Sequence, residues 1–305
     1  MKLIRYKNLL MIAFTMLVLH YGFLKLQNIP LVLNNLKFAF LILATLCIAA
    51  GGYIINDILD QETDQINKPN KVQIGNVFPE NLAYYIYAAL NIVGVGIGFY
   101  LSNIIEKPMF SSIFIFISFV LYIYSSSFKQ SLLIGNIIVS ALIAFVIILV
   151  GIFDLQPMIT PENQPILATF FKIILDYALF AFILNFIREI VKDLEDTKGD
   201  YNMGMNTLPI VLGVERTAKV VAVLSLIPSL LLFYYTYKYY FNNNLYISAF
   251  YSFAFLISPL IYFTVKSTSA KKQKDFKHLS SVLKLVMLMG IIFIAVVALN
   301  IKYNA

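Results

Sequence analysis

LKFAFLILATLCIAAGGYII, residues 36–55, is followed directly by NDILDQETD, residues 56–64. A helix needs about 20 apolar residues to cross the hydrocarbon core of a bilayer, and the first stretch meets that length. The second stretch then places four carboxylates at the membrane edge of the same helix. A membrane-crossing helix that ends in a cluster of acids predicts an integral membrane protein with a polar site at one surface.

The composition extends this prediction to the whole chain. Of 305 residues, 60% are hydrophobic and only 13% are charged, and the mean hydropathy is +0.81. This is not the composition of a soluble domain. We expect one all-α membrane domain over 1–305, in which nine transmembrane helices enclose a central apolar cavity that opens to a cytoplasmic polar cap. The expected spans are 8–26, 36–55, 81–101, 109–128, 132–153, 167–187, 217–237, 245–265 and 281–301.

The basic residues predict the orientation in the membrane. The formal charge is +7, but lysines and arginines are spread over short loops, which argues against a nucleic-acid partner. If nine helices alternate, most of these residues lie on one side. The positive-inside rule then places the N-terminus and the acidic loops on the cytoplasmic side of the membrane. We expect this membrane to be a bacterial or archaeal plasma membrane.

A second acidic stretch, DLEDTKGD at residues 193–200, has the same D-x-x-D-x-x-x-D spacing as residues 57–64. Spacings of three and seven place the carboxylates on one face of a helix. The two motifs follow the second and sixth expected helices. This suggests duplicated four-helix units, about 1–130 and 131–266, followed by a final helix; a short repeat confined to the loops is the alternative.

Two stripes of carboxylates indicate a site for divalent cations. Mg²⁺ takes oxygen ligands and commonly bridges protein carboxylates to phosphate oxygens. Plain helix ends rich in acids are the alternative, but negative charge at a helix C-terminus is unfavourable. Glu62 and Glu195 lie two residues from their motif neighbours, so we expect both to point away into solvent. The predicted metal ligands are Asn56, Asp57, Asp60, Asp64, Asp193, Asp196 and Asp200.

Several cations surround these acids in the sequence. Arg188 and Lys192 precede Asp196 by two turns and one turn on the same helix face, where they can form ion pairs or bind phosphate. Each basic residue could instead serve only to orient the chain in the membrane. The candidates for phosphate or substrate binding are Asn56, Lys68, Lys71, Lys129, Arg188, Lys192 and Lys198. His20 and His278 lie far from both motifs, and we expect no catalytic role for them.

These residues resemble the motifs of the UbiA-type intramembrane prenyltransferases. Residues 56–64 match the family pattern N-D-x-x-D-x-x-x-D, and Asp196 with Asp200 match its later D-x-x-x-D. The segments 188–193 and 207–209 are similar to the second family loop. Two departures stand out. Tyr124 and Lys129 are one residue further apart than the family's Y-x-x-x-K, and Lys71 stands where many relatives have an arginine.

The resemblance implies that Mg²⁺ ions bound by the two motifs hold the diphosphate of an allylic polyprenyl donor, with geranylgeranyl diphosphate favoured. It implies catalytic roles for Asp60, Asp64, Asp196 and Asp200, and substrate contacts by Tyr124 and Lys129. The lipophilic acceptor is expected to be similar to geranylgeranylglycerol phosphate. An aromatic quinone precursor is the alternative acceptor, and a cation-coupled transporter, with its site near the bilayer midplane, is the alternative of another class.

Overall fold

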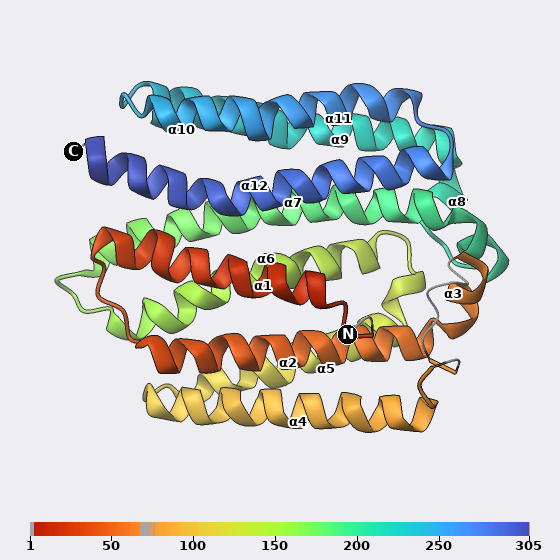
Figure 1. Cartoon of the computed structure of the whole chain (residues 1–305), viewed down its shortest axis with the longest axis horizontal. Coiled ribbons are helices and arrows are strands. Elements are labelled where there is room, and N and C mark those ends of the chain that lie inside the picture. The colour runs from red at the N-terminus through yellow and green to blue at the C-terminus, as the bar shows by residue number, and fades with distance from the viewer. Residues whose placement is uncertain (1–2, 68–73, 76, 305) are drawn as a thin grey trace.

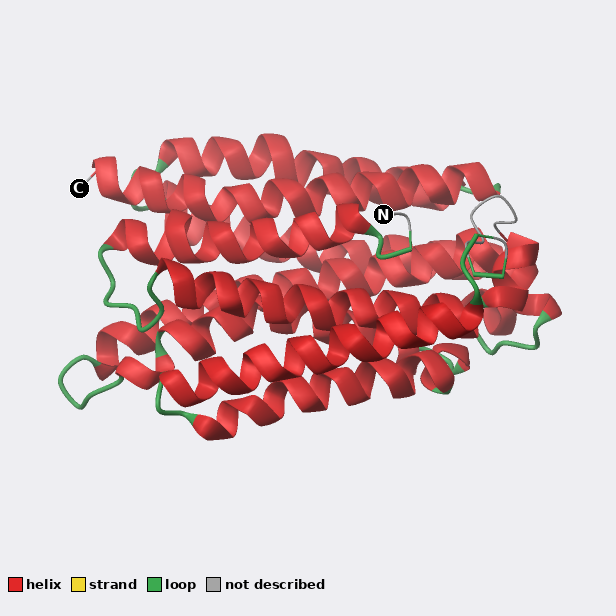
Figure 2. Cartoon of the chain, turned by 60° about the horizontal axis from the view of Figure 1, so that its bottom comes forward, coloured by secondary structure: helices red, strands yellow, loops and turns green. Residues whose placement is uncertain are grey.

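The computed structural model describes residues 3–67, 74–75 and 77–304. Within these residues, nine helical spans are long and apolar enough to cross a membrane, which confirms the expected all-α membrane fold. The spans lie side by side along one direction (Figures 1 and 2). They are Tyr6–Gln27 (beginning with α1, Tyr6–Leu17), α2 (Asn35–Leu59), α4 (Glu80–Ile104), Pro108–Ser126 (ending with α5, Ser111–Ser126), Ile134–Met158 (beginning with α6, Ile134–Asp154), α7 (Gln164–Asn202), Val214–Phe241 (beginning with α9, Val214–Tyr235), Tyr246–Ser269 (α10, Tyr246–Tyr251, through α11, Ser258–Ser269) and α12 (Gln273–Asn304).

Two short helices lie at the same end of the bundle. They are α3 (Gln61–Asn67), which follows α2, and α8 (Leu208–Leu212), which follows α7 (Figure 1). We call this the acidic end, because both acidic motifs lie there. Lys68 and Lys71, which the sequence predicts to bind substrate, lie outside the described residues.

The membrane helices begin and end where local chemistry dictates. Asn34 caps α2, and its side-chain oxygen accepts a 2.9 Å hydrogen bond from the backbone N–H of Lys37. α2 then continues for 25 residues to Leu59. α7 is longer than expected, with 39 residues, and it carries the whole second motif on helix rather than on loop. At 1.5 Å per residue it is roughly 58 Å long, about twice the hydrocarbon thickness.

Small residues allow close packing between neighbouring helices. α2 packs along α4, and a side-chain carbon at Gly94 would lie 2.8 Å from Cγ1 of Ile48 and 3.1 Å from the carbonyl oxygen of Ala44. Glycine at such positions lets two helix backbones approach in a membrane. α7 lies between α6 on one side and α9 and α12 on the other, so its faces are shared between two apolar core clusters.

A buried polar pair joins two helices at the end opposite the motifs. Nδ1 of His20 lies 2.7 Å from Oδ2 of Asp154, and both side chains are fully buried. The imidazole ring also stacks on Phe38, with ring centroids 3.8 Å apart. Buried polar groups in a membrane protein need such partners. His20 therefore holds helices together far from the acidic end.

Candidate functional site

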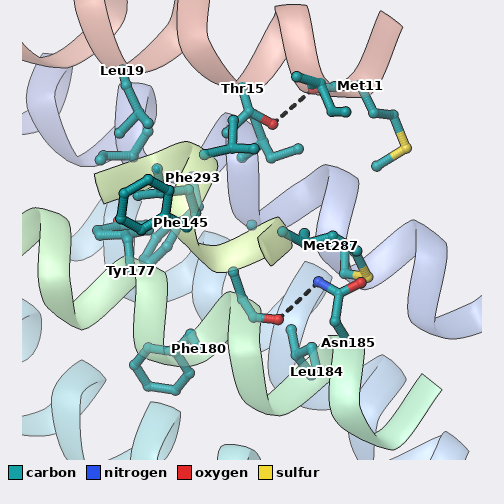
Figure 3. A pocket seen from close by; sticks show the side chains of 18 of the residues that line it. Met11, Thr15, Leu19, Phe145, Tyr177, Phe180, Leu184, Asn185, Met287 and Phe293 are labelled. Carbon is teal, nitrogen blue, oxygen red and sulfur yellow. Dashed lines mark hydrogen bonds between the residues drawn. The ribbon is translucent and has the colours of Figure 1, made fainter. Parts of the chain in front are cut away.

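A cavity of about 890 Å³ runs through the inside of the bundle. Its lining on α7 extends from Thr169 to Lys192, which corresponds to roughly 35 Å of helix. Large apolar and aromatic side chains, among them Phe145, Phe180 and Phe293, face it (Figure 3). The cavity therefore has the length of the hydrocarbon core and the surface chemistry of its lipid chains.

Two polar side chains midway along the cavity, Asn185 and Thr15, bind their own helices. The side-chain N–H of Asn185 donates to the carbonyl oxygen of Ala181 at 2.8 Å, and the hydroxyl of Thr15 donates to that of Met11 at 2.7 Å (Figure 3). Local hydrogen bonds of this kind satisfy the donors within one helix. The middle of the cavity consequently offers an isoprenoid or alkyl chain a mainly apolar wall.

A second, polar pocket of about 320 Å³ lies at the acidic end. Residues from both motifs line it, namely Asn56, Asp60, Asp64, Asp193, Glu195, Asp196 and Asp200. A further group lines both this pocket and the apolar cavity, and we call it the neck: Arg5, Asn56, Tyr124, Arg188, Glu189, Lys192 and Lys284. One ligand could thus place an anionic group in the polar pocket and an attached apolar chain in the cavity.

The first motif does not lie on one unbroken helix. α2 ends at Leu59, and Asp60 takes a non-helical conformation before α3 begins at Gln61. The backbone N–H groups of Asp60 and Asp64 still donate to the carbonyls of Asn56 and Asp60 at 3.0 and 2.8 Å. Asp60 is buried, and its Oδ2 accepts a hydrogen bond from the side-chain N–H of Asn56 at 2.5 Å.

Asp57 departs from the expectation that all three carboxylates of the first motif share one pocket. Its Oδ1 accepts a 2.6 Å hydrogen bond from Nη2 of Arg5, and Asp57 does not line the polar pocket. Burial is the largest single effect and lowers the pKa of Arg5, but the charge of Asp57, its hydrogen bond and the charges of Tyr53 and Asp64 together outweigh burial, so the pKa is raised and the guanidinium stays charged. Asn56 and Asp57 are consecutive residues of α2, so their side chains point about 100° apart around the helix, and only Asn56 faces the pocket.

The second motif lies on α7, where the helix continues past the membrane. Asp193, Asp196 and Asp200 all line the polar pocket, and Oδ2 of Asp193 accepts a 2.8 Å hydrogen bond from the side chain of Asn136. Glu195 also lines this pocket and is only partly exposed, so the expectation that it points away into solvent is wrong. Packing of α12 against α7 explains it, since the side chain of Gln273 donates to the carbonyl of Glu195 at 3.1 Å.

A tight turn accommodates the altered spacing between Tyr124 and Lys129. α5 ends at Ser126, and a 3-10 turn over Phe128–Gln130 brings Lys129 back to form an ion pair with Asp60. Gly135 leaves room for this turn, because a side-chain carbon there would lie 2.9 Å from the carbonyl oxygen of Phe128 and 3.1 Å from Cα of Lys129. Both Tyr124 and Lys129 line the polar pocket despite the extra residue between them.

Besides Asp57, two charged residues of the motif regions lie outside the pocket. Lys198, a candidate for substrate binding, is exposed on α7 and does not line the polar pocket. Its position two residues after Asp196 turns it to another face of the helix. Glu62 is exposed on α3, as expected, and also lies outside the pocket lining.

Glu189 lines the polar pocket but belongs to neither acidic motif. It is buried in the neck, where it accepts hydrogen bonds from Nζ of Lys192 at 2.6 and 2.9 Å and from Nη1 of Arg188 at 3.3 Å. The signal in the sequence was an acid between two cations within an apolar helix. Arg5, Asn136 and Lys284 also line the polar pocket, but their distance along the chain from both motifs gave no such signal.

The donor set suits a metal ion that arrives together with phosphate. Among the described residues, no three His, Cys, Asp or Glu side chains converge closely enough to hold an ion by themselves. Mg²⁺ usually binds to one or two carboxylates together with phosphate oxygens and water. The polar pocket offers such carboxylates from both motifs: Asp60 and Asp64 from the first, and Asp196 and Asp200 from the second.

Comparison with known proteins gives one family. The model of the UbiA prenyltransferase family matches residues 9–299. A digeranylgeranylglyceryl phosphate synthase from Methanopyrus kandleri is 33% identical over 180 residues, which are 59% of this chain and 59% of the relative. The synthase from Methanosphaera stadtmanae is 30% identical over 264 residues, 85% of this chain and 88% of the relative. The first of these matches thus spans less than two thirds of the relative's length.

Solved structures show the same fold. A structure of digeranylgeranylglyceryl phosphate synthase aligns with a TM-score of 0.64 at 24% identity, covering 97% of this chain and 96% of that one. A UbiA homologue from Archaeoglobus fulgidus, bound to DMAPP and Mg²⁺, aligns with a TM-score of 0.58 at 15% identity, covering 96% and 98%. At these sequence identities the structural similarity supports the fold alone, that is, the arrangement of the nine spans found in the described residues.

Proposed function

The chain belongs to the UbiA prenyltransferase family, and from this premise we propose that it transfers a prenyl group from an allylic polyprenyl diphosphate to a lipophilic acceptor, using Mg²⁺. One observation carries the proposal. A polar pocket lined by both acidic motifs joins a membrane-length apolar cavity through a neck that contains Arg188 and Lys192. The polar pocket suits the diphosphate of a polyprenyl diphosphate, and the apolar cavity suits its prenyl chain. Geranylgeranyl diphosphate is our favoured donor.

The charges in the pocket suggest how the donor is held. Mg²⁺, when bound, would neutralise the diphosphate and make it a better leaving group. Asp60, Asp64, Asp196 and Asp200 are the carboxylates proposed to hold the ions. Arg188, Lys192 and Lys129 lie in the same pocket and can donate charge-assisted hydrogen bonds to phosphate oxygens. These donors would stabilise the negative charge that grows on the diphosphate as the allylic bond breaks.

The cavity supplies the second requirement of the chemistry. Breaking an allylic carbon–oxygen bond produces a cationic carbon that water would consume. Apolar side chains such as Phe180, Leu184 and Met287 line the cavity beside the neck and exclude water from the prenyl chain (Figure 3). A nucleophilic group of the acceptor could then attack the allylic carbon in place of water.

We propose a glycerol-phosphate lipid similar to geranylgeranylglycerol phosphate as the acceptor. The relatives named above, digeranylgeranylglyceryl phosphate synthases, support this choice over an aromatic quinone precursor. Membership of a prenyltransferase family favours a transferase over a cation-coupled transporter. We also propose that the acidic end faces the cytoplasm, since the inner loops hold most of the basic residues.

The test is release of diphosphate by the purified protein. With Mg²⁺, geranylgeranyl diphosphate and a panel of acceptors, we expect diphosphate release together with a prenylated product detected by mass spectrometry. Asp60→Asn and Asp196→Asn should each reduce the rate at least about 100-fold, because they remove carboxylates from the pocket. Glu62→Gln is the matched control, because Glu62 is exposed and outside the pocket.

Two results would contradict the proposal. Wild-type protein that releases no diphosphate with any acceptor, while its activity follows an ion gradient, would support a transporter. Equal loss of activity in Glu62→Gln and Asp60→Asn would show that the pocket geometry does not select the functional carboxylates. Chelation of divalent ions should abolish turnover, and restored Mg²⁺ should recover it.

A further inference from the structure

One face of α12 carries a basic and hydroxylic strip at the acidic end. Lys277, Ser281 and Lys284 follow one another at intervals of four and three residues, and all three line the polar pocket together with Ser280. Such intervals place side chains on one helix face. α12 contributes no carboxylate to the lining of either pocket within the described chain. This wall therefore differs from the acidic walls formed by α2, α3 and α7.

The same face continues into the apolar cavity. Lys284 belongs to the neck, and beyond it Met287, Ile291 and Ile294 line the cavity toward the opposite end. Gly290 lies within this run, and a side-chain carbon added there would meet nothing within 4 Å. There is thus open space beside α12 directly below the lysines. A cationic head region followed by an open apolar groove on one helix is complementary to a lipid with an anionic head group.

The charge of Lys277 is not paired with an acid within the described chain. Lys129 pairs with Asp60, and Lys192 pairs with Glu189. By contrast, Lys277 forms no ion pair within the described chain and is exposed at the pocket. The position of the strip is set by the contact of Gln273 with the carbonyl of Glu195, which fixes the start of α12 beside the second motif.

We infer that this face of α12 binds the phosphomonoester head group of the acceptor lipid, with Lys277 and Lys284 contacting the phosphate and the lipid chain lying along Met287, Gly290 and Ile291. The inference deepens the proposed function and rests on it. A phosphate here needs no metal, because its partners are ammonium and hydroxyl groups. It would lie apart from the donor diphosphate, which needs the carboxylates of the other walls.

Direct binding tests this site without turnover. Isothermal titration of the detergent-solubilised full chain, with Mg²⁺ present, uses three probes: a saturated long-chain monoether of glycerol phosphate, the same monoether without phosphate, and inorganic phosphate. We expect the phosphate-bearing ether to bind at least about ten-fold more tightly than the alcohol, the effect of one or two charge-assisted hydrogen bonds. Inorganic phosphate should bind far more weakly than the ether, because it lacks the chain.

Variants assign the effect to α12. Lys277→Gln should remove most of the ten-fold preference for the phosphate-bearing ether and leave binding of the alcohol and of geranylgeranyl diphosphate unchanged; Lys284→Gln is the second test. Lys274→Gln is the matched control, since Lys274 is an exposed lysine of the same helix that does not line the pocket. Gly290→Phe should weaken binding of both ethers by filling the space beside the helix.

Three outcomes would overturn the inference. They are equal affinity for the ether with and without phosphate, inorganic phosphate binding as tightly as the ether, and loss of geranylgeranyl diphosphate binding in Lys277→Gln, which would assign the strip to the donor. Failure of the proposed function would be distinguishable. In that case the wild-type protein would show the expected ether binding but would form no prenylated product.

Discussion

The neck depends on a single buried carboxylate. Glu189 accepts hydrogen bonds from Lys192 and Arg188, so it fixes two cations at the boundary between the polar pocket and the apolar cavity. Without Glu189, two partly buried positive charges would repel each other. Breaking a buried charge pair leaves the remaining charges uncompensated, which costs more than the pair itself contributes. We therefore regard Glu189 as a positioning residue for the two cations.

A double-mutant cycle on Glu189 and Lys192 tests this role. Glu189→Gln and Lys192→Gln should each lower thermal stability and raise the KM for the allylic diphosphate about ten-fold or more. Their effects on stability should be non-additive, with a coupling free energy of about 0.5–3 kcal/mol. Stability is measured by thermal unfolding in detergent.

The matched control is another lysine–glutamate pair on the surface. Nζ of Lys219 lies 3.2 Å from Oε1 of Glu215, and both side chains are largely exposed. The same substitutions there should change neither stability nor KM measurably, because exposed ion pairs are screened by water. Additive effects at Glu189 and Lys192 would contradict the positioning role.

At the scale of elements, a short turn and a long helix bring the two motifs to one pocket. α7 extends past the membrane, so the second motif is held on regular helix, whereas the first motif spans the break between α2 and α3. α3 packs against α7, which closes the pocket between the motifs. The turn after α5 supplies Lys129 to this arrangement, and Gly135 determines how close that turn can lie.

Gly135→Ala should therefore impair activity without preventing folding. The added carbon would lie 2.9 Å from the carbonyl oxygen of Phe128, so the turn must shift and carry Lys129 away from Asp60. We expect the rate of prenyl transfer to fall about ten-fold or more, since small misplacements at a site are costly. Gly96→Ala is the control, because a carbon there meets nothing within 4 Å. Wild-type activity in Gly135→Ala would show that the turn is not constrained.

At the scale of the whole molecule, the two pockets give the bundle a direction. α12 begins at the acidic end and runs to the opposite end of the bundle (Figure 1), where it ends at Asn304. The excess of basic residues belongs to the loops of the acidic end. We expect that end to face the cytoplasm, so that water-soluble diphosphates and Mg²⁺ reach the polar pocket from the cytosol.

Reporter fusions test this orientation. An alkaline phosphatase fused after the last residue should be active, because the enzyme needs the extracytoplasmic side. The same reporter inserted at Gly204, in the loop after α7 at the acidic end, should be inactive, and green fluorescent protein at the two positions should give the opposite pattern. Phosphatase activity at Gly204 would reverse the proposed orientation. The proposed duplication of four-helix units stays a prediction.

Hydropathy and helical periodicity alone determined the class of this protein, because the free energy of placing apolar residues in a bilayer is local to each segment. The nine spans follow from it, and the spacing of the two acidic motifs indicated which end would hold the site. Only the tertiary structure decided which charges meet. Arg5 with Asp57 and Lys129 with Asp60 combine residues far apart in sequence, and the lysines of α12 line the same pocket as acids more than 70 residues before them. No local pattern encodes the packing of distant helices that brings these charges together.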